Sequence, residues 1–290
     1  MTQPDTGFDD ANVGLWTDPE HFEVTAERIA EYARATNDPI AAHLTGDIAP
    51  PVFAIVPVFD SMLSPAVDVM PVELVPRVVH GEQDFHFHRA IRPGDRLVSR
   101  GTMIGYEGLP NGTRAAIYLE CRTDAGELVN EQYVTVFVRN YDAGKKLGEL
   151  SPGHKFDERL RAEPMLAKAA AHVDADQTFR YSPASGDPMP IHLDEEIARS
   201  AGLPGIIAHG LCTMAMTSWG LLTEVGGSDV TRLKRLAVRF AKPVLPGDDL
   251  ETRIWKSGSE PGFTTYAFET ARGDDMVITD GLAEIIDEKN

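Results

Sequence analysis

Only two cysteines occur in the 290 residues, and basic residues are outnumbered by acidic ones. Cys121 and Cys212 lie far apart, so we expect reduced thiols in a cytoplasmic protein. Lysine and arginine total 27 against 45 acids, and the net charge of −18 argues against nucleic acid or an anionic membrane surface as the main partner. No apolar run reaches about 18 residues and residues 1–14 carry no basic or apolar stretch, so neither a membrane span nor a signal peptide is expected.

Several catalytic motifs are missing as well. The chain has no G-x-S-x-G turn for a serine nucleophile, no G-x-G-x-x-G after a strand and no phosphate-binding loop. The sequence therefore shows none of the usual motifs of triad hydrolysis or of nucleotide-dependent redox chemistry, and no cofactor is expected. What remains is an ordinary globular composition, 42% hydrophobic and 25% charged, which is enough for a sizeable core.

The chain contains an internal repeat. "YARATNDPIAAHL" (residues 32–44) aligns without a gap with "YSPASGDPMPIHL" (181–193). Two further pairs of segments match in the same order: 50–54 with 204–208, and 85–97 with 236–250. A repeat of about 150 residues is too long for a solenoid unit. The sequence therefore predicts a duplicated domain, divided into residues 1–145 and 146–290, with the glycine- and lysine-rich segment 141–155 as linker.

Each half predicts the same succession of elements. In the second half, "DEEIARSAG" predicts a short helix capped by Asp194, and "HGLCTMAMTSWGLLTEVGG" predicts a longer helix that is apolar nearly all round. Strand-like segments follow at 236–241, 250–255, 263–270 and 276–286, and the first half shows four in the same order. The pattern predicts an α+β fold in which each half is an antiparallel sheet curled around one long buried helix.

Asp187 and His192 are the first candidates for chemistry. Proline at 188 and at 190 keeps their segment out of a regular helix and stiffens the link between the two side chains. A carboxylate and an imidazole that face each other can hold a water, one removing a proton while the other donates one. The alternative is a turn-capping aspartate and an ordinary surface histidine, because this spacing alone is a weak signal.

Gly210 lies at the predicted start of the buried helix, where backbone N–H groups have no partners within the helix. With no side chain in the way, this positive helix end suits a carbonyl oxygen that gains negative charge during a reaction. The alternative is a glycine that serves close helix packing.

Cations gather between Val230 and Gly247, a stretch without acids that holds Arg232, Lys234, Arg235, Arg239 and Lys242. In so acidic a protein this is the place suited to a multiply charged anion, such as the phosphates of a nucleotide. A solvated strand face is the alternative.

His86 and His88 alternate along a predicted strand and so share one face. That arrangement suits a pair of metal ligands, but no further ligand stands at a convincing spacing, and no metal site is expected. Cys212 falls in the apolar helix and is expected in the core.

The segment 181–211 resembles the signature of the MaoC-like, type 2 (R)-specific enoyl-CoA hydratases, which are hot-dog folds. The match rests on Tyr181, Ser185, Gly186, Asp187, Pro190, His192, Asp194, Ala198, Gly202, Pro204, His209 and Gly210. "RFAKPVLPGD" (239–248) is similar to the strand after the hot-dog helix. The resemblance implies a tandem double hot-dog, in which residues 1–145 form a degenerate domain that accommodates the acyl chain and residues 146–290 form the catalytic domain.

The resemblance also implies roles for single residues. Asp187 and His192 would hold the catalytic water, the Gly210 N–H would polarise the thioester carbonyl, and Ser218 would orient the aspartate. Substrate and coenzyme A phosphates would be bound by His209, Arg235, Arg239 and Lys242.

Two positions depart from the family pattern. Family members usually carry Asn two residues after the aspartate, where this chain has Met189. In the first half Asp38 and His43 keep the pair spacing, but "AIV" (54–56) stands where the second half has "AHG". We expect the first-half pair to be a structural remnant.

The sequence thus predicts a hydro-lyase of acyl-CoA metabolism that hydrates trans-2-enoyl-CoA reversibly to the (R)-3-hydroxyacyl-CoA. Three alternatives remain: a hot-dog acyl-CoA thioesterase, a non-catalytic acyl-CoA-binding subunit that needs a partner chain, and a metal-dependent enzyme using His86 and His88. An acyl-CoA thioester is the expected partner, and the chain is expected to be a monomer or a homodimer.

Overall fold

In the computed structural model, which describes residues 7–288, the strands of both halves form one antiparallel sheet of eleven strands. The strand order is β1-β3-β4-β5-β2-β8-β11-β10-β9-β7, with β6 paired to β3. The first half contributes β1 (Glu20–Glu23), β2 (Val78–Phe87), β3 (Arg96–Leu109), β4 (Gly112–Thr123), β5 (Leu128–Arg139) and β6 (Lys146–Gly148). The second half contributes β7 (Ala167–His172), β8 (Leu233–Phe240), β9 (Asp249–Glu260), β10 (Phe263–Arg272) and β11 (Asp275–Ile286).

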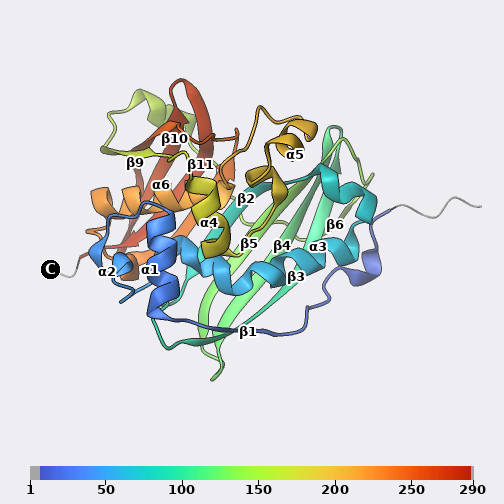
Figure 1. Cartoon of the computed structure of the whole chain (residues 1–290), viewed down its shortest axis with the longest axis horizontal. Helices are drawn as coiled ribbons and strands as arrows, with labels where there is room; N and C mark the ends of the chain where they lie inside the picture. Colours follow the sequence, from blue (N-terminus) through green and yellow to red (C-terminus); the bar gives the residue numbers. More distant parts are fainter. Residues whose placement is uncertain (1–6, 289–290) are drawn as a thin grey trace, which may run out of the picture.

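The two halves meet where β2 pairs with β8, near the middle of the sheet (Figure 1). In this register Glu82 lies opposite Arg239, and His86 lies opposite Arg235. The short strand β6 pairs with β3, so residues 146–148 extend the sheet of the first half. The division at 145/146 stays a prediction.

The predicted strands are confirmed with longer bounds. The four segments expected after the second helix fall in β8 to β11, and those of the first half fall in β2 to β5. Strand β2 begins at Val78 and ends at Phe87. It therefore contains His86, whereas His88 lies just beyond its end. Cys121 and Cys212 are both buried and unpaired, and the cytoplasmic location stays a prediction.

The helices of the second half follow the sequence pattern. α5 (Glu195–Ser200) begins at Asp194, whose carboxylate accepts the backbone N–H groups of Glu196 and Ile197 at 2.9 Å. α6 (Gly210–Val225) is followed by its C-cap, Gly226, and residues 211–218 and 220–222 of the helix are buried. Because α6 has almost no polar face, the sheet must cover it on several sides, as the sequence predicted.

The first half has a broken counterpart of α6. It starts as a 3₁₀ helix, η2 (Pro51–Val58), and continues as α3 (Phe59–Val69), with Pro57 and Pro65 inside. Proline removes a backbone donor and crowds the preceding turn, which explains the irregular start. By length and composition residues 51–69 could cross a membrane, but 67% of the apolar window is buried, in keeping with a core helix.

α1 (Ala26–Ala35) and α4 (Gln177–Ser185) lie side by side across the junction of the halves (Figure 1). Tyr32 and Tyr181, which are equivalent in the repeat, join their hydroxyl groups at 3.1 Å. Arg28 donates to the Ala184 carbonyl oxygen at 3.3 Å. The sequence analysis did not predict α4, because Pro183 interrupts its helical pattern. The contact holds the C-terminal end of α4, from which the candidate site continues.

The remaining helical segments are short. They are α2 (Ala41–Leu44), η1 (Asp10–Asn12), η3 (Val72–Arg77), η4 (Glu158–Ala162), η5 (Pro190–His192) and η6 (Val230–Arg232).

Candidate active site

The segment after α4 holds Asp187 in place through its backbone and side chain. α4 ends at Gly186, whose φ of +82° is a left-handed conformation that favours glycine. The Ser182 hydroxyl donates to the Asp187 carbonyl oxygen at 2.7 Å, and the Met189 N–H donates to the Asp187 carboxylate at 3.0 Å. The backbone of Met189 therefore supports the aspartate, although its side chain cannot do what an asparagine amide would.

His192 lies at the end of η5 and is 8% exposed. Its Nδ1–H donates to the Ile207 carbonyl oxygen at 2.8 Å. This bond places the proton on Nδ1, so Nε2 of the neutral ring carries a free lone pair.

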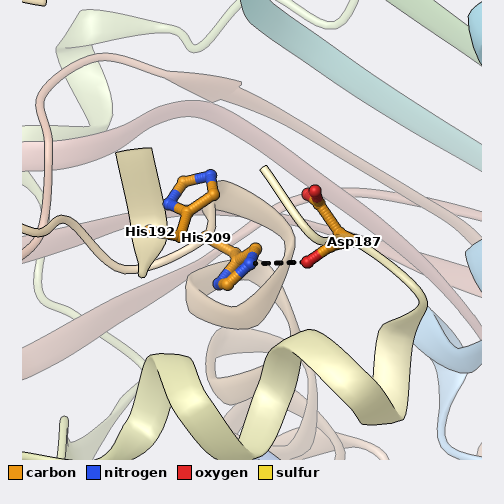
Figure 2. Close-up of side chains that lie close together, drawn as sticks. All are labelled: Asp187, His192 and His209. Atoms are coloured by element: carbon orange, nitrogen blue, oxygen red, sulfur yellow. Dashed lines mark hydrogen bonds between the residues drawn. The ribbon is translucent and has the colours of Figure 1, made fainter. Parts of the chain in front are cut away.

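His209 brings the two parts of the site together. Its Nε2–H donates to the Asp187 carbonyl oxygen at 3.3 Å, and its ring stacks on His192 with centroids 3.8 Å apart and planes inclined by 25°. Figure 2 shows the three side chains gathered within one small space. Behind them, the Tyr181 ring lies 4.9 Å from the His209 ring.

Asp187 and His192 leave room for a small molecule between them. Polar atoms of Asp187, His192 and His209 all lie within 4.8 Å of one another, and no direct hydrogen bond joins the Asp187 carboxylate to His192 in the described chain. A water bonded at about 2.8 Å to both groups spans about 4.5 Å. The geometry therefore suits a water shared by a carboxyl group and an imidazole.

Burial shifts the pKa values of Asp187 and His192 in opposite directions. Burial raises the pKa of Asp187 above its ordinary 3.8. The bond from the Met189 N–H and the nearby His192 act in the opposite direction but are weaker. Burial lowers the pKa of His192 below its ordinary 6.5. The bond to Ile207 and the charge of Asp187 act in the opposite direction but are weaker. Burial also lowers the pKa of His209 to about 3, so this ring is neutral near pH 7. Burial therefore shifts the pKa values of Asp187 and His192 towards each other.

The same three side chains are close enough to share a metal ion but do not converge on one point. A metal bound by imidazole lies in the plane of the ring, about 2 Å from the nitrogen. The planes of His192 and His209 are stacked and inclined by only 25°, so they intersect far from both rings. The arrangement as it stands favours acid–base chemistry over metal binding.

Gly210 is the first residue of α6 and adjoins His209, its N-cap. A Cβ atom added at this glycine would lie 3.2 Å from the Phe240 ring, tighter than ordinary van der Waals contact. The helix end is partly exposed. The glycine therefore permits close packing on Phe240, and polarisation of a carbonyl by its N–H stays a prediction.

Ser218 makes no hydrogen bond to Asp187 in the part of the chain that the structure describes. Its hydroxyl donates to the Ala215 carbonyl oxygen at 2.8 Å, one turn earlier in α6, and the side chain is buried. Eight residues of helix rise about 12 Å, which separates Ser218 from the helix end. The role of orienting the aspartate, implied by the family signature, is filled here by Met189 and Ser182.

The predicted coenzyme A cations are paired with acids from other strands. Arg235 makes two bonds to the buried Asp84 carboxylate, at 2.7 and 3.0 Å. Lys242 bonds Asp275, and Arg239 lies 3.7 Å from Glu82. Residues 230–247 contain no acid of their own, but in the fold acids from neighbouring strands pair with these cations.

Arg235 and Arg239 also lie on the far side of the sheet. Side chains alternate along a strand, and Phe240 faces the end of α6, so Arg239 and Arg235 face away from it. Arg239 there lines a cavity of about 310 Å³ together with Lys155 and Arg161. The structure does not bring these two arginines to the catalytic pair, and phosphate binding by them stays a prediction.

His86 and His88 contact different acids. His86 lies 3.3 Å from Asp84, while His88 donates to Glu131 at 2.8 Å. Within residues 7–288 the cluster spaced for a shared ion is the one at Asp187, not this pair.

The first-half pair has closed on itself. His43 Nδ1 donates to the Asp38 carboxylate at 2.7 Å, and both residues are buried. No space for a bridging water is left between them, whereas the second-half pair is open. This supports the expectation that Asp38 and His43 are structural.

Three groups in or next to the site carry no signal in the sequence. They are the Ile207 carbonyl oxygen that fixes the His192 tautomer, the ring of Phe240, and His80 of the first half, whose ring lies 5.0 Å from that of Phe240. A backbone acceptor and contacts across β2 and β8 leave no motif. Tyr181 was visible in the signature, but its bond to Tyr32 was not.

Comparison with known sequences follows the same division into halves. Residues 158–276 match the MaoC like domain, and residues 11–131 match the FAS1-like, dehydratase domain region. The chain is 30% identical over 218 residues to the 3-hydroxyacyl-thioester dehydratase Y of Mycobacterium tuberculosis, a match that covers 72% of this chain and 73% of that protein. It is 30% identical over 213 residues to the probable enoyl-CoA hydratase 2 of Dictyostelium discoideum, with 72% and 70% covered. It spans only 28% of the mouse peroxisomal multifunctional enzyme type 2, at 30% identity and with 72% of this chain covered.

Solved structures share the architecture. A MaoC-like dehydratase from Phytophthora Capsici superposes with a TM-score of 0.85 at 22% identity, covering 97% of this chain and 98% of the other. A Mycobacterium tuberculosis protein described as a double hotdogfold superposes with a TM-score of 0.64 at 14% identity, covering 97% and 98%. At these identities the likeness concerns the fold alone, and it confirms the predicted double hot-dog.

Proposed function

The chain belongs to the MaoC-like family of hydratases and dehydratases, and from this we propose that it adds water reversibly to a trans-2-enoyl-CoA, giving the (R)-3-hydroxyacyl-CoA. One observation carries the proposal: polar atoms of Asp187 and His192 lie within 4.8 Å of each other, without a direct hydrogen bond, in the segment that His209 joins to the start of α6. The names of the relatives supply the substrate class. The length and shape of the acyl chain are left open.

The tautomer of His192 supports an assignment of the two roles. In the proposed step His192, with its lone pair on Nε2, accepts a proton from the water as the oxygen attacks the β-carbon. A protonated Asp187 donates its proton to the α-carbon, and burial raises the pKa of this carboxyl group, the direction that this role needs. The step leaves an imidazolium and a carboxylate, and transfer of one proton from His192 to Asp187 restores the starting state. Dehydration runs through the same steps in reverse.

The end of α6 supports the same reaction. When the oxygen of water bonds to the β-carbon, negative charge moves onto the thioester oxygen as an enolate. The Gly210 N–H at the positive end of a 16-residue helix is a donor suited to that oxygen. Loss of such a donor typically costs about 10²- to 10³-fold in rate.

The first half is proposed to serve the substrate rather than the chemistry. Its acid–imidazole pair is closed, and Ile55 stands at the position equivalent to His209. Its core helix is broken by Pro57. The departure of this helix from the regular geometry of α6 supports a role other than catalysis for the first half, and we assign it the acyl chain.

Replacement of Asp187 by Asn tests the assignment. The amide cannot donate a carboxyl proton, so hydration of crotonyl-CoA, followed by the loss of enoyl absorbance, should fall by about 10³-fold or more. The Met189 N–H can still be accepted by the amide oxygen, so the circular dichroism spectrum and melting temperature should stay close to those of the wild type.

A matched replacement in the first half is the control. Asp38→Asn disturbs a buried pair of the same residue types, so it should lower stability while leaving turnover per folded molecule nearly unchanged. Near-normal hydration by the Asp187 variant would refute the assignment, and release of free thiol without loss of enoyl absorbance would indicate a thioesterase.

A further inference from the structure

We propose that His209 is a positioning residue, which locks the segment of Asp187 and the ring of His192 to the N-terminal end of α6. The inference rests on the proposed hydratase function, and it assigns to His209 a role other than binding substrate. It follows from what the main chain and the side chain of this one residue each hold.

The main chain of His209 belongs to the helix. Its carbonyl oxygen accepts the N–H groups of Cys212 at 3.0 Å and Thr213 at 3.1 Å, which makes it the N-cap of α6. Most N-cap side chains turn back to bond the first turn. The His209 imidazole makes no such bond. It is therefore free to reach across to the neighbouring segment.

The side chain holds both members of the catalytic pair. Nε2–H donates to the Asp187 carbonyl oxygen, the atom that also accepts the Ser182 hydroxyl. The ring face lies against His192 at 3.8 Å between centroids. Because Gly210 follows directly in the chain, the distance from the acid–base pair to the helix end depends on this one ring.

The surroundings of His209 are rigid and buried. The residue is 2% exposed, and the Tyr181 ring lies 4.9 Å away, itself bonded to Tyr32 of the first half. His209 Nδ1 is buried without a hydrogen-bond partner in the described chain. A buried unpaired nitrogen is unfavourable, so an apolar side chain would fill this space better if packing were its only purpose.

Few groups around His209 titrate in the neutral range. Asp187 and His192 face it from the catalytic segment, and Tyr181 faces it from α4, with Tyr32 and Cys212 behind. Burial raises the pKa values of both tyrosines above 10 and that of Cys212 to about 12. The tyrosines and Cys212 therefore stay protonated near neutral pH, which leaves Asp187 and His192 as the neighbours of His209 whose titration an experiment can follow.

Two variants separate the two contacts of His209. His209→Phe keeps a ring against His192 but removes the donor to Asp187, and His209→Gln keeps a donor but removes the ring. Each should lower kcat for crotonyl-CoA by about 10- to 100-fold while KM changes by less than about threefold, because misplacement of reacting groups by an ångström is costly. His21→Gln, on the exposed strand β1, is the control.

The pKa of His192, followed by NMR of labelled histidine, gives a second readout. It should rise towards its ordinary value in His209→Gln, where water reaches the uncovered ring, and stay low in His209→Phe. The signal is assigned by its absence in His192→Gln. This measurement needs no turnover, so it tests positioning even if the wild type proves inactive on enoyl-CoA and the proposed function fails.

The outcomes are distinct. Reduced kcat in both folded variants, with the His192 pKa changed only in His209→Gln, supports the proposal. A kcat within about twofold of the wild type in both variants overturns it. Loss of the wild-type circular dichroism spectrum in both variants also overturns it, in favour of a role in core packing.

Discussion

Two pairs of the same residue types behave differently in the two halves, and their surroundings explain why. In the first half Asp38 and His43 are bonded to each other at 2.7 Å and sealed in the core. In both halves the carboxylate accepts the backbone N–H two residues later, from Ile40 or from Met189. The halves differ at the imidazole, because Nδ1 of His192 donates to the Ile207 carbonyl oxygen and not to the aspartate. A spacing of five residues therefore does not make a site by itself.

The pH dependence of stability should report the buried His209. Its pKa of about 3 in the folded protein lies below the ordinary 6.5, so at acid pH the unfolded chain takes up a proton that the folded chain refuses. Stability is therefore lost as pH falls from about 6.5 towards 3. Between pH 7 and pH 5 this residue accounts for a loss of about 2 kcal/mol in the free energy of unfolding.

Urea unfolding at both pH values checks this prediction. His209→Gln should lose about 2 kcal/mol less than the wild type over the interval, whereas His21→Gln should lose as much as the wild type. Equal losses in wild type and His209→Gln would contradict the depressed pKa.

At the scale of elements, the contact of α1 with α4 ties the first half to the catalytic segment. The hydroxyl groups of Tyr32 and Tyr181 bond each other in a fully buried setting, and burial raises both of their pKa values. Tyr32→Phe or Tyr181→Phe alone leaves one hydroxyl without its partner, which should lower the free energy of unfolding by about 1–2 kcal/mol. The double variant should lose no more than either single one.

Denaturant unfolding of the four proteins forms a double-mutant cycle. A coupling of about 1 kcal/mol between the two positions would confirm that the hydroxyl pair stabilises the junction. Losses that simply add would show that each tyrosine acts alone.

The sequence predicted elements well where one local signal dominates. Asp194 caps α5, glycine closes α6, and alternation identifies β8 to β11, as expected. It missed α4, because Pro183 breaks the pattern and the support for that helix comes from α1, about 150 residues earlier. The site was predicted to the same extent: Asp187, His192 and His209 carry a motif, whereas the Ile207 carbonyl and Phe240 are brought in by tertiary structure.

At the scale of the molecule, the ion pair of Arg235 with Asp84 links the halves across β8 and β2. The arginine side chain is 14% exposed and the aspartate 2%. Burial opposes ionisation of Asp84, but the nearby His86 imidazole and the bonds from Arg235 outweigh it and hold the pKa of Asp84 below the ordinary value. Arg235→Met leaves a buried charge poorly compensated and should lower the free energy of unfolding by about 3–5 kcal/mol.

Lys242→Met is the matched control for this prediction. Its pair with Asp275 is about half exposed, so its loss should change stability by less than about 1 kcal/mol. A similar small effect of both variants in chemical denaturation would show that the Arg235 pair does not hold the halves together.

The continuous sheet has a consequence for self-association. In each half taken alone, β2 or β8 would be a long edge strand with unpaired backbone groups. Pairing of β2 with β8 satisfies these groups. The edge strands that remain in the described chain are β1, β6 and β7, of four, three and six residues. Short edge strands offer few unpaired backbone groups to another chain, which makes amyloid-like stacking unfavourable. A homodimer of this protein would accordingly have to assemble through side-chain surfaces rather than by extending the sheet.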